Sequence, residues 1–190
     1  MIQLHSATSA QWTETVLNDF DRFLSDHAAA EKKAAGMAIS MLSHYPDRAE
    51  LVSAMADLAV EEMTHFRDVL RLMQRRGLAM RPDKKDSYVN QLRGIMRSDS
   101  GEYLMDRLLV GGIIEARGYE RFGLVGEALN DPTLKRFYTA LAQSESRHSQ
   151  LFADLAALYF PNTAISQRLK ELLTAEATIL KQLPFRAALH

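Results

Sequence analysis

The stretch Val60–Phe66, VEEMTHF, decides the fold, because it sets a carboxylate and an imidazole into an otherwise apolar helical pattern. Apolar residues spaced alternately by four and three positions predict one buried face of a helix. This spacing selects Leu51, Met55, Leu58, Glu62, His65, Val69 and Leu72. An uncompensated carboxylate in a core costs several kcal/mol, so Glu62 needs a partner.

A second segment repeats this pattern later in the chain. The same spacing there selects Leu134, Tyr138, Leu141, Glu145, His148, Phe152, Leu155 and Tyr159. Two further apolar seams each contain one carboxylate, Glu31 and Glu115. The Glu-x-x-His motifs at 62–65 and 145–148 are 83 residues apart, and the two single glutamates are 84 apart. The chain is therefore predicted to consist of two helical hairpins of the same design.

A few helix-breaking residues predict where the turns lie, and no segment has the pattern of a strand. Pro46 and Pro132 mark two tight turns, with Asp131 as the N-cap of the following helix. The expected helices are residues 10–44, 47–77, 100–129, 132–159 and 163–181, with a short one near 88–96. The midpoint between the two glutamates of each hairpin falls on its turn. Each hairpin should therefore bring its single Glu level with its Glu-x-x-His motif.

Residues 78–99 form a long connection between the hairpins. Fully extended, such a segment reaches roughly 70 Å, which exceeds the ~45 Å length of a 30-residue helix. A crossover of this length is the connectivity of ferritin-like folds. We therefore expect one all-α domain over residues 1–190. It is a ferritin-like four-helix bundle with a long crossover between helices 2 and 3 and an extra C-terminal helix.

Six side chains are the candidate metal ligands: Glu31, Glu62, His65, Glu115, Glu145 and His148. Two divalent cations would balance four carboxylates, and this nitrogen and oxygen donor set suits iron or manganese better than zinc or calcium. We assign the single Glu and the His of each hairpin to one metal, with Glu62 and Glu145 bridging. The six ligands leave coordination positions open, and open positions on paired iron invite dioxygen. The six residues are thus predicted to be both metal-binding and catalytic.

Two neighbours of the candidate ligands receive separate interpretations. His27, one turn before Glu31, is interpreted as a hydrogen-bonded core histidine or a pocket residue rather than a ligand. Glu61 is a candidate for orienting a ligating histidine, although Ser144 occupies the equivalent place in the other half.

Small residues cluster beside the candidate ligands: Ala34, Ala38, Gly111, Gly112 and Gly118. Glycine inside a helix costs about 1 kcal/mol relative to alanine. Close helix packing would explain these residues, and so would room for dioxygen and a substrate side chain. We favour the second explanation because three glycines accumulate on one helix.

Four stretches resemble the bacterial tRNA hydroxylase family: AAAEKKAAGMAISML (28–42), LAVEEMTHFRDVLRLMQRRG (58–77), GGIIEARGYERF (111–122) and FYTALAQSESRH (137–148). The resemblance spans about residues 20–160 and includes the context of all six candidate ligands. Enzymes of that family hydroxylate the isopentenyl side chain of a 2-methylthio-isopentenyl-adenosine beside the anticodon. The resemblance implies a di-iron monooxygenase that uses O2, two iron ions and two electrons from an external reductase.

A basic segment gives an independent indication of an RNA partner. Residues 66–97 contain nine basic and three acidic side chains, a charge of +6 in a chain of net −1. The basic residues are Arg67, Arg71, Arg75, Arg76, Arg81, Lys84, Lys85, Arg93 and Arg97. Such a patch can follow the phosphates of a folded RNA, although most charge runs are only solvated faces.

Composition narrows the classes of protein to which the chain could belong. The chain has no cysteine, which excludes a rubredoxin module of the rubrerythrin type. No signal peptide is evident at the N-terminus, and the longest strongly apolar run is too short for a membrane span. A cytoplasmic protein with no membrane partner is therefore expected. A quinone-type di-iron hydroxylase and a ferroxidase or iron store stay as alternatives. The oligomeric state and the electron-donor protein are left open.

Overall fold

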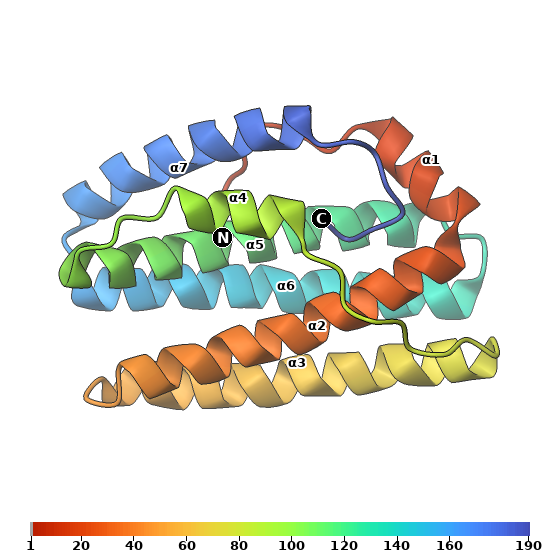
Figure 1. Cartoon of the computed structure of the whole chain (residues 1–190), viewed down its shortest axis with the longest axis horizontal. Coiled ribbons are helices and arrows are strands. Elements are labelled where there is room, and N and C mark those ends of the chain that lie inside the picture. The colour runs from red at the N-terminus through yellow and green to blue at the C-terminus, as the bar shows by residue number, and fades with distance from the viewer. Residues whose placement is uncertain (1) are drawn as a thin grey trace. The chain divides into compact units, whose positions relative to one another are not determined.

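The computed structural model describes residues 2–190, and Figure 1 shows helices joined by turns and loops. The helices are α1 (Ala10–Asn18), α2 (Phe20–His44), α3 (Ala49–Arg75), α4 (Ser87–Gly94), α5 (Ser100–Ala128), α6 (Pro132–Tyr159) and α7 (Asn162–Gln182). No strand occurs within residues 2–190, so the all-α prediction is confirmed. The predicted boundaries agree to within a few residues, apart from an interruption at Asp19.

The described chain divides into two compact units, each built on one helical hairpin. The first unit comprises residues 14–84 and 186–189 and contains α2 and α3, which we call the first hairpin. The second unit comprises the N-terminal residues through Thr13, residues 85–185 and His190. It contains α4 and α7 together with α5 and α6, which we call the second hairpin.

A short turn joins the two helices of the first hairpin, and α2 (orange) and α3 (yellow) run side by side in Figure 1. Its turn surrounds Pro46, where the amide of Arg48 donates to the carbonyl of Tyr45 at 3.1 Å. At the far end, α3 stops at a Schellman motif: Gly77 takes a φ of +69°, and the amide of Leu78 bonds the carbonyl of Met73 at 2.9 Å. Glycine suits this position because the left-handed region disfavours a Cβ.

The second hairpin turns where the sequence places the break. Asp131 caps α6, and its side chain accepts from the amides of Thr133 at 2.7 Å and Leu134 at 3.0 Å. Pro132 occupies the first helical turn, where its missing N–H costs nothing. The predicted seams of α5 and α6 are buried along most of their length, so the register that aligns the glutamates with the turn is correct.

The single helix expected over residues 10–44 is wrong, because the chain breaks at Asp19. Its backbone leaves the helical region, at φ −138° and ψ 56°. Asn18 and Asp19 are adjacent residues whose side chains compete for backbone hydrogen bonds, so the break falls where helix propensity is low. On α1, Trp12 is buried against Arg121, whose guanidinium lies 4.7 Å from the indole ring.

Two ionic clusters join α4, α5 and α7 of the second unit. In the first cluster, the fully buried Asp106 of α5 accepts from Arg97 at 2.6 Å and from Arg168 of α7 at 2.7 Å. These hydrogen bonds outweigh the effect of burial and hold the pKa of Asp106 below its ordinary value. The carboxylate therefore stays ionised between two arginines.

The second cluster surrounds Arg117 of α5, which is fully buried. Its guanidinium donates to Glu176 of α7 at 2.7 Å and also pairs with Glu120. The Tyr88 hydroxyl of α4 donates to the same Glu176 oxygen at 2.8 Å. Burial and the nearby Glu176 charge raise the pKa of Tyr88 well above its ordinary value, which keeps the phenol a donor.

Candidate metal centre

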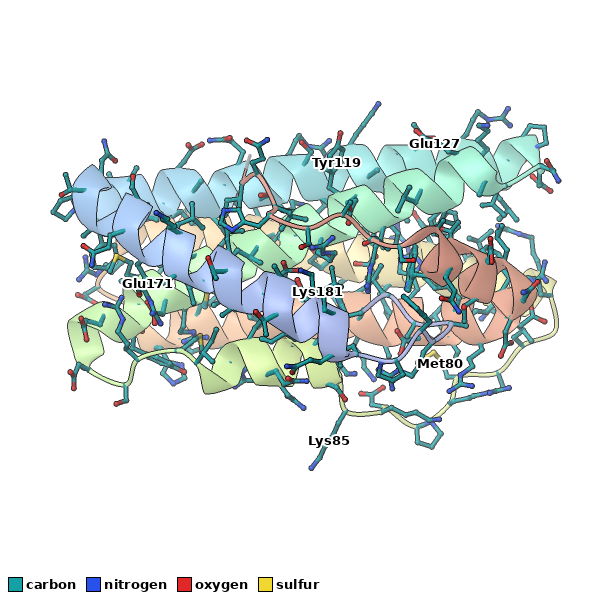
Figure 2. All side chains as sticks on the ribbon, turned by 90° about the horizontal axis from the view of Figure 1, so that it is seen from above. Met80, Lys85, Tyr119, Glu127, Glu171 and Lys181 are labelled. Carbon is teal, nitrogen blue, oxygen red and sulfur yellow. The ribbon has the colours of Figure 1, made fainter. Side chains whose placement is uncertain are left out.

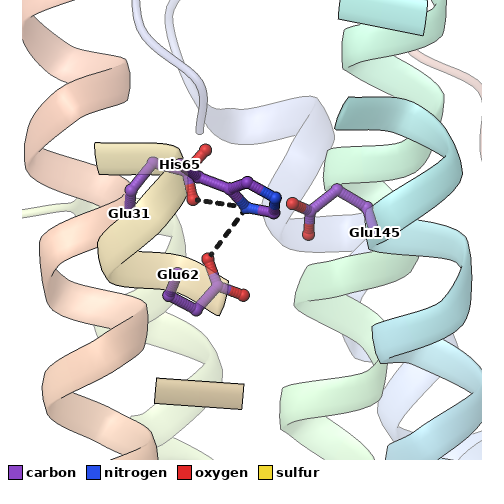
Figure 3. Close-up of side chains that lie close together, drawn as sticks. All are labelled: Glu31, Glu62, His65 and Glu145. Carbon is purple, nitrogen blue, oxygen red and sulfur yellow. Dashed lines mark ion pairs between the residues drawn. The ribbon is translucent and has the colours of Figure 1, made fainter. Parts of the chain in front are cut away.

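The first hairpin brings Glu31, Glu62 and His65 together, and we call these residues the first half-site (Figure 3). Glu31 comes from α2, whereas Glu62 and His65 come one turn apart from α3. The Nδ1 atom of His65 lies 3.9 Å from Oε2 of Glu31 and 3.7 Å from Oε2 of Glu62. The predicted alignment of Glu31 with the Glu-x-x-His motif across the turn is confirmed.

These separations are too long for hydrogen bonds. Ligands of a transition metal usually lie about 2.0–2.2 Å from it, so two ligands of one ion are roughly 3–4 Å apart. The glutamates are 3% and 1% exposed, at Glu31 and Glu62 respectively. Two buried carboxylates beside an imidazole are the donors that iron or manganese accepts. The residues of the first half-site therefore fit a metal of this class.

His27 extends the first half-site by one helical turn of α2. It is fully buried, and its Nε2 lies 2.6 Å from Oε1 of Glu31. Burial, reinforced by the nearby His65, lowers the pKa of His27 to about 3, so the ring is neutral near pH 7. The structure confirms the interpretation of His27 as a hydrogen-bonded core histidine.

The second hairpin brings together Glu115, Glu145 and His148, which we call the second half-site. Here Nδ1 of His148 lies 3.9 Å from Oε2 of Glu115 and 3.8 Å from Oε2 of Glu145. All three residues are at most 5% exposed. The donors and their separations match the first half-site, so these residues fit the same class of metal.

Both histidines turn Nδ1 toward the carboxylates and Nε2 toward the residue four positions earlier. Nε2 of His65 lies 3.9 Å from Glu61, and Nε2 of His148 lies 3.5 Å from the hydroxyl of Ser144. Ser144 also accepts from Arg147 at 3.0 Å. Glu61 and Ser144 thus occupy equivalent places, as the sequence indicates, although neither distance is that of a strong hydrogen bond.

Gly111 and Gly112 of α5 serve close packing rather than open space, so our preferred interpretation of these two glycines is wrong. A Cβ on Gly111 would meet the Phe152 ring at 2.9 Å, and one on Gly112 would meet Ile2 at 2.7 Å. Gly118 instead lies against Glu145, whose Cγ a Cβ would approach to 3.4 Å. Glycine lets α6 side chains approach the α5 backbone.

The predicted basic segment is exposed over most of its length, but not all of its charges face solvent. Arg67 and Arg71 are both more than half exposed and share Asp68. Lys85 extends away from the ribbon in Figure 2. Arg97 was grouped with this patch, yet it binds Asp106. Arg97 is therefore structural, whereas the basic side chains of residues 67–84 are exposed within the first unit.

Two lysines next to Glu31 form hydrogen bonds with residues of the crossover. Lys32 donates to Asp83 at 2.9 Å, and Lys33 donates to the carbonyl of Lys84 at 2.7 Å. Sequence reasoning missed this tether, because residues 51 positions apart show no pattern that relates them. Among residues 2–190, no helix combines the length and hydropathy that a membrane crossing requires.

Comparisons with known proteins agree with one another. A family model described as tRNA-(MS[2]IO[6]A)-hydroxylase (MiaE) matches residues 2–190. A tRNA 2-(methylsulfanyl)-N(6)-isopentenyladenosine(37) hydroxylase of Pseudomonas putida is 38% identical over 174 residues, which is 92% of this chain and 84% of that protein. The protein of the same name from Salmonella typhimurium is 35% identical over 107 residues, 56% of this chain and 39% of that protein.

A solved structure is also similar to this chain. It is described as protein 43 with aldehyde deformylating oxygenase activity from Synechococcus. The TM-score is 0.93 at 35% identity, over 98% of this chain and 93% of that one. The predicted ferritin-like class of the fold is confirmed.

Proposed function

The chain belongs to the tRNA-(MS[2]IO[6]A)-hydroxylase family, and from this premise we propose that it hydroxylates the isopentenyl side chain of 2-methylthio-isopentenyl-adenosine next to the anticodon of tRNA. The observation that carries the proposal is the pair of matched half-sites, each with two buried carboxylates and an imidazole, in a chain that the family model matches from residue 2 to 190. Fold alone does not select the substrate, since one scaffold hosts several oxygenases.

The two half-sites are proposed to act as one dinuclear iron centre in a single domain spanning residues 1–190. Its ligands are Glu31, Glu62, His65, Glu115, Glu145 and His148, with Glu62 and Glu145 as bridges. The support is chemical. Each hairpin offers two carboxylates and one imidazole, so two divalent ions would balance four anions that burial otherwise makes unstable.

Two iron ions bound there would supply the reductive activation of dioxygen, with two electrons and two protons from outside the substrate, so that one oxygen atom enters an allylic C–H bond and the other leaves as water. The six candidate side chains would hold the metals. His65 and His148 present Nδ1 to the carboxylates of their own hairpin. The low exposure of all four glutamates limits solvent access to the donors.

The exposed basic segment is proposed to hold the tRNA. Arg75, Arg76, Lys84 and Lys85 are exposed at the end of α3 and in the crossover, where they can neutralise backbone phosphates. Reading RNA shape and a splayed-out base requires such contacts rather than a groove-reading helix. Electrons are proposed to come from a separate donor protein, and a tRNA substrate implies a cytoplasmic location.

Mass spectrometry of hypomodified tRNA tests the proposal. The iron-loaded full-length protein is incubated with reductant and 18O-labelled dioxygen, and the modified nucleoside is analysed. We expect a gain of one oxygen atom that carries the label, and no gain with a Glu115→Ala variant. If the protein has a proven iron content, leaves tRNA unchanged and deformylates an aldehyde, the result would contradict the proposal and favour the activity described for the Synechococcus protein.

A further inference from the structure

The first half-site contains a hydrogen bond that the metal ligands alone do not require. His27 Nε2 and Glu31 Oε1 are 2.6 Å apart, four residues apart on α2, and both side chains are buried. The His27 ring stands 5.9 Å from the Phe23 ring, between centroids, which helps fix its orientation. A short, buried hydrogen bond to a carboxylate is strong and directional.

The direction of this hydrogen bond follows from the charge states. A neutral imidazole has one N–H donor and one acceptor nitrogen, whereas a carboxylate only accepts. When Glu31 acts as an anionic ligand, His27 must therefore donate its Nε2 proton to Oε1.

The two oxygens of Glu31 then have different roles. Oε1 accepts from His27, whereas Oε2 is the atom 3.9 Å from Nδ1 of His65. The hydrogen bond fixes the rotation of the carboxylate, so that Oε2 is the oxygen turned toward the other donors of the half-site. Such contacts to a ligand define its orientation and its basicity.

The second half-site lacks this device. The residue one turn before Glu115 is Gly111, which has no side chain, and the Phe152 ring lies where its Cβ would project. At the register position of Phe152, the first hairpin has Val69. The first hairpin therefore combines His27 with a small Val69, and the second combines Gly111 with a large Phe152. Only the first hairpin therefore has a side-chain donor at this position.

We propose that His27 is a positioning residue that orients Glu31 for metal binding through Oε2, and that its replacement by Gly111 in the second hairpin makes the two metal positions inequivalent. The proposal rests on the proposed dinuclear centre. Its consequence is selective, because loss of His27 should weaken one metal position and spare the other. A residue with only a structural role would instead change both positions together, or change stability without changing either one.

Cobalt(II) titration of the metal-free full-length protein, followed by calorimetry and visible absorption, tests this selectivity. For His27→Leu we expect the affinity of one of the two Co(II) positions to fall by about 10- to 100-fold, the usual effect of removing a hydrogen-bond partner from a ligand. The other affinity should stay within about two-fold. For His27→Gln we expect most of the affinity to return, because the glutamine amide can donate from a place close to that of Nε2.

Two further variants control for indirect effects. His27→Asn has the same chemistry but a shorter reach, so it should bind like His27→Leu. This comparison with His27→Gln decides the question even if the leucine variant does not fold. Tyr88→Phe removes a buried hydrogen bond to Glu176, which is not a candidate ligand, and should leave both Co(II) affinities unchanged.

Mössbauer spectra of protein loaded with 57Fe give a second measurement. We expect two iron environments in the wild type, with only one of them altered in His27→Leu. Unchanged Co(II) affinities and spectra in the folded His27→Leu and His27→Asn variants would overturn the role of His27 and leave the dinuclear centre standing. Equal weakening of both positions would also overturn it. A wild-type protein that binds no Co(II) would overturn the centre itself.

Discussion

The two hairpins present the same candidate ligands in different surroundings. The first hairpin relies on exposed ion pairs such as Lys32 with Asp83 and Arg76 with Asp21. The second hairpin shares its unit with α4 and α7, to which Asp106 and Arg117 connect it through buried ionic clusters. The common feature is the helical register that places a Glu opposite a Glu-x-x-His motif. The helical register thus brings the candidate metal donors together in each hairpin, whereas the surroundings of the two half-sites differ.

Loss of a bridging carboxylate should have the largest effect. Glu145→Ala is expected to reduce the iron content from about two ions per chain to nearly none, because the bridge would serve both ions. Glu62→Ala, its counterpart in the first hairpin, should do the same. Metal analysis after gel filtration measures both. Glu127→Ala, an exposed substitution on α5, is the control, and wild-type iron content in Glu145→Ala would refute the ligand assignment.

Asp106→Asn should strongly destabilise the second unit. The substitution leaves Arg97 and Arg168 without their shared anion, and we expect a loss of roughly 3 kcal/mol in the free energy of unfolding, at the lower end for broken buried pairs because both arginines keep some contact with solvent. Urea denaturation measures this value. Lys32→Ala in the first hairpin is the matched control and should cost less than about 1 kcal/mol, as for other exposed pairs.

The stabilisation by Asp106 should also depend on pH. Its pKa is lower in the folded chain than the ordinary value of 3.8. The unfolded chain therefore takes up the proton first as the pH falls. The stabilisation is complete above the ordinary value and is lost as the pH falls through the lowered one, so the difference between wild type and Asp106→Asn should shrink only in acid. A difference that shrinks between pH 7 and 6 would contradict this explanation.

Charge removal at the end of α3 and in the crossover should weaken tRNA binding about ten-fold and leave the iron content unchanged. Neutralising Arg75, Arg76, Lys84 and Lys85 to glutamine removes up to four phosphate contacts. The slope of log affinity against log salt should then fall by about one for each lost contact. A control variant neutralises the same number of exposed charges at Lys135, Arg136, Lys170 and Lys181. Equal tRNA affinities in the two variants would remove the basic segment from the interface.

A pair of glycine substitutions should have small effects of opposite sign. Gly111→Ala in the second hairpin forces a Cβ against the Phe152 ring and should cost about 1–3 kcal/mol. Gly36→Ala in the first hairpin meets nothing within 4 Å and should stabilise the chain by up to about 1 kcal/mol. Thermal unfolding compares them. Destabilisation of equal size in both variants would show that the packing difference between the hairpins is unimportant.

Local patterns in the sequence predicted most of the fold and both half-sites. The breaks at Pro46 and Pro132 and the spacing of four and three residues define each register, and those features depend only on neighbouring residues. The break at Asp19 was missed because apolar residues at positions 16, 20 and 24 keep a helical spacing through it. Periodicity reports which face is buried, but it does not detect a single non-helical residue.

Long-range polar contacts could not be predicted. Arg97 looks like part of a basic surface until Asp106 and Arg168 surround it. The three residues come from separate elements, and no local rule relates them. Gly111 and Gly112 were misread for a similar reason, since Phe152 of α6 and Ile2 fill the space beside them. Which side chain fills the space beside a glycine depends on the packed structure. Composition therefore leaves close packing and open space equally possible.

X-ray absorption spectroscopy of the iron-loaded wild-type chain tests the central claim most directly, because it reports whether the two half-sites form one centre. The account predicts about two iron ions per chain, nitrogen and oxygen neighbours only, and an iron–iron vector no longer than about 4 Å, as in other two-metal sites. A single iron per chain, or two irons without a vector between them, would contradict it.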